Sequence, residues 1–136
     1  MSSDPFELLS GVWATLNAGL AIDVYSYVPQ GEGYPYVALA GITSIAGDDK
    51  TNDRQEYTIQ IHTWDKNVAS FQSVMDNMQA IRGLLHKQET NISVTGYKVV
   101  LSRIEFEEML QEGSSGNGGD NYFHGVQRLR IIVEDI

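Results

Sequence analysis

The feature that most constrains this chain is a change of hydrophobic period between residues 57 and 85. Four side chains alternate in the first part: Tyr57, Ile59, Ile61 and Thr63. Apolar side chains then recur at helical spacing: Val68, Phe71, Val74, Met75, Met78, Ile81 and Leu85. A period of two indicates a half-buried strand, and a period of about 3.6 indicates an amphipathic helix. Because the period changes across residues 65–67, the sequence predicts a helix that folds back on a sheet.

Size and composition are those of one ordinary globular domain. A chain of 136 residues can bury about two thirds of its unfolded surface, so we expect residues 1–136 to form a single domain. The hydrophobic share of 42% indicates a folded chain rather than a disordered one. The absence of cysteine excludes disulfides and thiolate metal sites. We expect neither a signal peptide nor a membrane span, because the start lacks a basic segment and no apolar run is long enough.

The net charge narrows the class of partners. The formal charge is −9, and the nine Lys and Arg residues are scattered along the chain. Proteins that grip nucleic acid need clustered basic side chains, which displace counterions from phosphate. The sequence therefore argues against an electrostatic grip on DNA and favours partners that are basic or that bind through apolar contact.

A first helix is predicted near the N-terminus. Ser3 or Asp4 can cap it, and Pro5 fits its first turn, where no N–H is required. Gly19 can supply the left-handed conformation that ends it. We expect one apolar face on this helix: Phe6, Leu9, Trp13 and Leu16.

Five segments read as strands: 22–28, 36–46, 55–64, 92–107 with an interruption near Gly96, and 122–134. In the second strand, four residues are expected to share a face: Val37, Leu39, Thr43 and Ile45. In the last strand, another four are expected in phase: Phe123, Leu129, Ile131 and Val133. The order of elements predicts an α+β fold: a mainly antiparallel sheet of four to five strands, two helices packed on one face, and a long C-terminal hairpin.

Two polar segments join strands of this sheet, at residues 47–53 and 113–120. The first carries oxygen ligands but lacks the alternation, central glycine and distal glutamate of a calcium-binding EF-hand loop. The second has the composition of a flexible linker, and such a segment becomes ordered when a partner supplies contacts. These segments give the candidate interface residues: Asp48, Asp49, Asp53, Gly113, Ser114, Ser115, Gly116, Asn117, Gly118, Gly119 and Asp120.

No residue pattern indicates catalysis or a metal centre. The three histidines are His62, His86 and His124, and their spacing in sequence matches no metal motif. His62 reads as a histidine on the surface of the sheet. The acidic run around Glu107 reads as a charged rim, because nothing separates its carboxylates into acid and base. We therefore expect no catalytic residue, cofactor or metal.

The order of these patterns resembles a known family. The strand start Tyr34-Pro35-Tyr36-Val37, the strand 57–64 closing on Trp64, the helix through Met75 and Ile81, and two long C-terminal strands carry the resemblance. Together they resemble the tail-completion or tail-terminator proteins of long-tailed bacteriophages and gene transfer agents, over about residues 8–133. The glycine-serine segment 113–120 departs from the family pattern by its length.

The resemblance implies a structural virion protein without enzymatic activity. Its expected form is a homo-oligomer, a hexameric ring that caps the head-proximal end of the tail tube and joins it to the head connector. DNA would pass through the lumen without specific binding, and assembly would take place in the bacterial cytoplasm, away from membranes. Two alternatives stay open: another neck protein, such as a head–tail adaptor or stopper, and a small ligand-binding domain or enzyme with a tyrosine-rich pocket.

Overall fold

The computed structural model describes residues 5–26, 33, 35–46, 54–66, 71–112 and 121–135. The elements are α1 (Pro5–Gly19), β1 (Asp23–Tyr25), β2 (Tyr36–Ala46), β3 (Arg54–Lys66), α2 (Gln72–Leu85), the short 3-10 helix η1 (Glu89–Asn91), β4 (Tyr97–Glu112) and β5 (Tyr122–Asp135). Every candidate interface residue predicted above lies outside the described residues. None of the described helices is both long and apolar enough to cross a bilayer.

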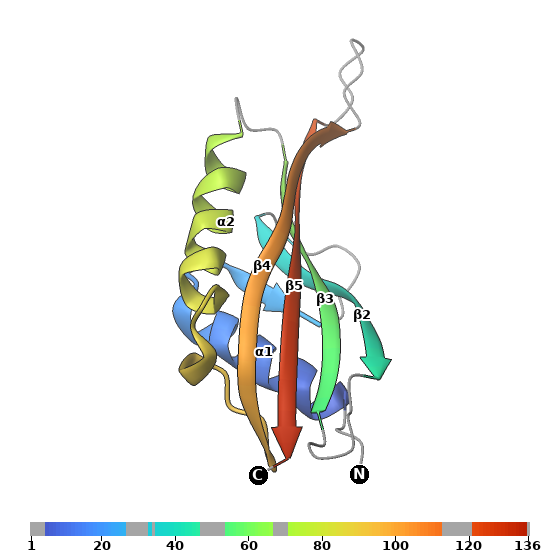
Figure 1. Cartoon of the computed structure of the whole chain (residues 1–136). Coiled ribbons are helices and arrows are strands. Elements are labelled where there is room, and N and C mark those ends of the chain that lie inside the picture. The colour runs from blue at the N-terminus through green and yellow to red at the C-terminus, as the bar shows by residue number, and fades with distance from the viewer. Residues whose placement is uncertain are drawn as a thin grey trace.

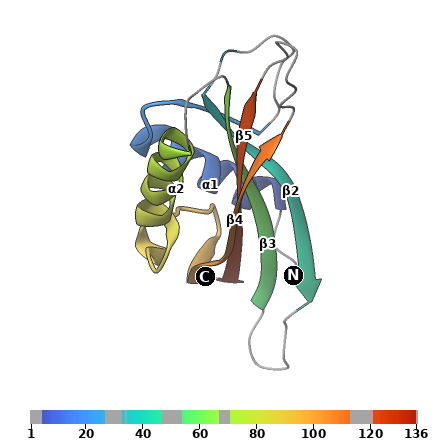
Figure 2. The same cartoon turned by 90° about the horizontal axis from the view of Figure 1, so that it is seen from above.

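The five strands form one sheet in the order β1-β2-β3-β5-β4. The short β1 pairs in parallel with β2, and every other neighbouring pair is antiparallel. Both helices cover the same face of the sheet, as the two perpendicular views show (Figure 1 and Figure 2). The predicted α+β class, the helices on one face and the C-terminal hairpin are all confirmed. None of the described helices lies on the opposite face, called the outer face below.

The helix that follows β3 packs as the change of period predicts. Tyr57, Ile59 and Ile61 are almost completely buried, so the alternating face of β3 points at the helices. On α2, the buried side chains are Val74, Met78, Ile81 and Leu85. Met75 was expected on this face and is exposed instead, because it lies at the edge of the apolar stripe. Val68 lies outside the described residues. This helix-on-sheet contact buries apolar area, which stabilises the fold.

The buried face of α1 differs from the prediction. Leu8, Val12 and Leu16 are completely buried, whereas Phe6 and Trp13 are exposed. The predicted face and the buried face share only Leu16. The prediction places the larger aromatic side chains in the core. The aliphatic set fits the closely packed interior, so α1 turns its aromatic residues away from the core.

The phase of β2 also differs from the prediction. The bounds of the strand are as expected, and Val37 and Leu39 are buried. A bulge between Leu39 and Gly41 then inserts one residue, after which Ile42 packs against the core and Thr43 is exposed. A bulge shifts the alternation by one residue, so the predicted common face of Val37 and Thr43 is wrong.

The two edge strands of the sheet, β1 and β4, have bounds that differ from the predicted ones. Of the strand predicted over 22–28, the described residues 22–26 include only the three residues of β1, and residues 27–28 lie outside the described residues. The strand predicted over 92–107 begins only at Tyr97 and continues to Glu112. Gly96 has a φ of 83°, a backbone conformation that glycine adopts without strain, and this turn separates η1 from β4. In β5 the predicted phase is confirmed, since Phe123, Leu129, Ile131 and Val133 are all buried.

Candidate assembly surfaces

The outer face divides into a charged half and an apolar half. In the charged half, Arg130 pairs with Glu56 at 3.0 Å and Arg54 pairs with Glu134 at 3.1 Å. The hydrogen bond from Arg130 is the main cause that lowers the pKa of the Glu56 carboxyl from its ordinary value. These charges satisfy one another within the chain. Exposed ion pairs of this kind contribute little to stability, about 1 kcal/mol or less.

The apolar half of the outer face lies at the end of β4 and β5 that leads into segment 113–120. Here the strand register places Trp64, His124 and Leu110 side by side on β3, β5 and β4. The rings of Trp64 and His124 stack, with centroids 3.8 Å apart and planes inclined by 8°. Four residues further along β5, the Arg128 guanidinium lies 4.9 Å from the centre of the Phe106 ring. We call Trp64, Phe106, Leu110 and Arg128 the outer patch.

The register also brings two histidines together. Nδ1 of His62 and Nε2 of His124 are 2.6 Å apart, and Nε2 of His62 lies 3.3 Å from Oε1 of Gln60. His62, which the sequence predicts on the surface of the sheet, is half-buried, and His124 is buried. The pair is 62 residues apart in sequence, and only the pairing of β3 with β5 could have revealed it. Within the described part of the chain, no third side chain joins the pair to make a metal-binding group.

The acidic run of β4 does not form a carboxylate pair. Glu107 points to the helix side, where it accepts a hydrogen bond of 2.8 Å from Gln127 and pairs with Arg82 at 3.2 Å. Glu108 is opposite Val126 in the register and so lies on the outer face. Successive residues of a strand point to opposite faces, which keeps the two carboxylates apart. This arrangement lacks the geometry that two cooperating catalytic acids need.

The edge strand β4 carries a second apolar surface on its helix side. A groove of about 140 Å³ lies between α2 and β4 and is lined by Met75, Met78, Gln79, Glu107 and Met109. Methionine side chains adapt their shape to different partners, so such a groove suits a protein contact better than a small polar substrate.

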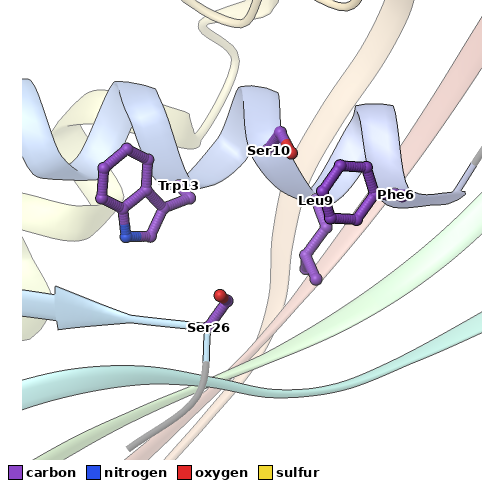
Figure 3. A pocket seen from close by; sticks show the side chains of 5 residues that line it. All are labelled: Phe6, Leu9, Ser10, Trp13 and Ser26. Carbon is purple, nitrogen blue, oxygen red and sulfur yellow. The ribbon is translucent and has the colours of Figure 1, made fainter.

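A third apolar surface, called the α1 hollow below, lies between α1 and the end of β1. It has a volume of about 170 Å³ and is lined by Phe6, Leu9, Ser10, Trp13 and Ser26 (Figure 3). The indole Nε1 of Trp13 donates a hydrogen bond of 2.9 Å to the carbonyl oxygen of Val24. This bond joins α1 to β1 beside the hollow. Phe6 has 69% of its surface exposed.

The polar cluster around η1 serves the fold. Glu89 accepts hydrogen bonds from the Ser102 backbone at 2.9 Å and from Arg103 at 2.6 Å. Burial raises the pKa of the Glu89 carboxyl, but the hydrogen bonds outweigh it, and the net pKa is lowered. The Ser102 hydroxyl donates to the Leu85 carbonyl at 2.7 Å, which ties the end of α2 to β4. The cluster therefore fixes the helix on the sheet and is not a ligand site.

Comparisons with known proteins agree with an assembly role. The family model for tail completion protein gp17 matches residues 9–134. A chain of the solved structure "Virion of native gene transfer agent (GTA) particle" has a similar fold, with a TM-score of 0.68 and 19% identity over 93% of this chain and 94% of that one. No curated protein sequence matches the chain. The chain belongs to the tail completion protein gp17 family and is a structural protein of phage-like tails.

Proposed function

We propose that the chain is a tail terminator that closes the head-proximal end of the tail tube as a hexameric ring. The family match over residues 9–134 carries this proposal. The three apolar surfaces support it, since a protomer in a ring needs contacts with its neighbours and with the tube. The described residues hold structural polar clusters rather than a convergent catalytic set, and we propose that the protein acts through contacts alone.

The acidic charge fits the passage of DNA through such a ring. With a formal charge of −9, acidic side chains facing the lumen would repel phosphate, and the DNA would slide without being held. In this proposal the protein meets DNA without binding a sequence. It assembles in the bacterial cytoplasm and remains in the neck of the virion.

The segments 47–53 and 113–120 are proposed to contact the partners along the tail axis, the tail tube protein on one side and the head connector on the other. Both join antiparallel neighbours of one sheet, β2 with β3 and β4 with β5. Because these two joins lie at opposite ends of β3 and β5, the rigid sheet would present the segments to partners on opposite sides.

Native mass spectrometry of the chain, alone and mixed with the cognate tail tube protein, tests this function. We expect a closed ring of identical subunits, formed or strengthened in the mixture. A chain that stays monomeric with the tube protein but forms a ring with the head connector would instead be an adaptor or stopper. A chain that stays monomeric with both would contradict any ring-forming role.

A further inference from the structure

We propose that the outer patch of one copy packs into the α1 hollow of the next copy, and that this contact joins neighbours in the ring. The inference rests on the proposed ring function. A ring of identical chains needs a heterologous contact, in which two different surfaces of the protomer meet. The outer patch and the α1 hollow meet this need, because the register places the patch on the outer face of the sheet, and the hollow is lined by α1, one of the two helices that cover the other face (Figure 1).

The two surfaces fit in size. Phe106 and Leu110 have 39% and 37% of their surfaces exposed, although both are large apolar side chains. They stand on the same face of β4, opposite Arg128 and His124 in the register. The α1 hollow measures about 170 Å³. An apolar cavity of about 150 Å³ accepts a benzene molecule, so the hollow has room for one aromatic or leucine side chain.

The two surfaces also fit in charge. Arg128 lies over Phe106 and makes no ion pair with any other described residue. Asp23 is exposed on β1, directly before the residue that accepts the Trp13 hydrogen bond, and it too has no ion pair among the described residues. A cation beside the apolar patch can therefore meet an anion beside the hollow. Such complementary charges fix the register of an interface and speed its formation.

A second copy fits this pair of surfaces better than a different protein does. A copy supplies both complementary halves at once, with the opposite charges already in place. The remaining half of the outer face has its charges paired within the chain, as Arg130 with Glu56. Association is thereby directed to the other half, where Trp64 and Leu110 offer apolar area that is interrupted by the carboxylate of Glu108.

Cysteine cross-linking tests the contact directly, because the natural chain contains no cysteine. Ser26→Cys places a thiol beside the hollow, and Glu108→Cys places one between Phe106 and Leu110 on the outer face. The two single variants are mixed with tail tube protein under mild oxidation. We expect covalent dimers only when both variants are present, and a ladder that ends at the ring size when one chain carries both cysteines.

Each other outcome counts against the contact. Dimers from one variant alone would show that like surfaces meet, which overturns the heterologous contact. A ring seen by native mass spectrometry with no cross-link in the mixture would overturn this inference and leave the terminator function standing. Absence of any ring with the tube protein would overturn both.

Charge reversal gives an independent test that does not depend on thiols. Arg128→Glu and Asp23→Arg should each lower ring formation about tenfold, and the double variant should restore it, as expected for one close charge pair. Lys87→Glu makes the same charge change at an exposed site outside both surfaces and should leave ring formation unchanged. Circular dichroism checks that each variant is folded. A double variant no better than the single ones would refute the pairing.

Discussion

The backbone N–H of Ile104 donates a hydrogen bond of 2.9 Å to Nδ1 of His86. This bond joins the residue after α2 to the middle of β4, and Nδ1 can accept it only while the ring is neutral. Burial is the largest cause that lowers the pKa of His86, and the charges of Arg82, Lys87 and Arg103 lower it further. The folded chain therefore binds a proton at His86 less readily than the unfolded chain does.

The sign of the resulting pH dependence follows from this pKa. The stability that His86 contributes is fully present above its ordinary pKa of 6.5 and is lost as the pH falls from there through the lower pKa of the folded state. The free energy of unfolding, measured by urea titration, should therefore fall between pH 7.5 and 5.5. His86→Asn, whose amide oxygen can accept the same bond without titrating, should show a smaller fall. An equal fall in both proteins would contradict this role of His86.

Gly125 on β5 allows α2 to approach the sheet closely. A Cβ at this position would lie 2.9 Å from Cγ1 of Val74 and closer still to Sδ of Met78. We expect Gly125→Ala to lower the free energy of unfolding by about 1–3 kcal/mol, the usual cost of overpacking a core. Gly41→Ala is the matched control, because a Cβ there meets nothing within 4 Å. Equal unfolding midpoints for the two variants would show that α2 is free to shift.

Thr63 is fully buried, and its hydroxyl has no hydrogen-bond partner among the described residues. Leaving a buried hydroxyl unpaired costs about 1–3 kcal/mol. Thr63→Val keeps the shape and removes the polar atom, so it should raise the free energy of unfolding by about 1 kcal/mol or more. Thr58→Val, on the outer face of the same strand, should change it by about 0.5 kcal/mol or less. A loss of stability in Thr63→Val would indicate that the hydroxyl is hydrogen-bonded.

Deletion of residues 114–119 tests the proposed axial contact of the glycine-serine segment. The short segment left between β4 and β5 can still close the hairpin, so the shortened chain should fold with an unchanged circular dichroism spectrum. It should lose joining to the tube or the head, measured by electron microscopy of assembled particles. Normal joining by the shortened chain would remove this segment from the mechanism.

The sequence predicted a buried face correctly where a single apolar pattern was present and the strand had no bulge. The alternation of Tyr57, Ile59 and Ile61 predicted the buried face of β3, because burial of one sheet face dictates it. The face of β2 was mispredicted beyond Gly41, since a bulge depends on pairing with β3 rather than on local sequence. The sequence of α1 offers two possible buried faces, one with Phe6 and Trp13 and one with Leu8 and Val12. Tertiary packing buries the aliphatic face.

The candidate surfaces were harder to predict than the fold. The His62–His124 pair and the outer patch both arise from the register of β3, β5 and β4, and no spacing along the sequence encodes that register. The α1 hollow follows from the exposure of Trp13, which the sequence pattern had placed in the core. The axial contacts of segments 47–53 and 113–120 stay a prediction from the sequence, because both segments lie outside the described residues.

Tube length is the most direct measure of the central claim that this chain terminates a tail tube. Purified cognate tail tube protein is allowed to polymerise with and without the chain, and lengths are measured by negative-stain electron microscopy. The account predicts tubes that carry a ring at one end and stop growing once it is bound, with the length falling as the chain concentration rises. Tubes of unchanged length with no ring at either end would contradict it.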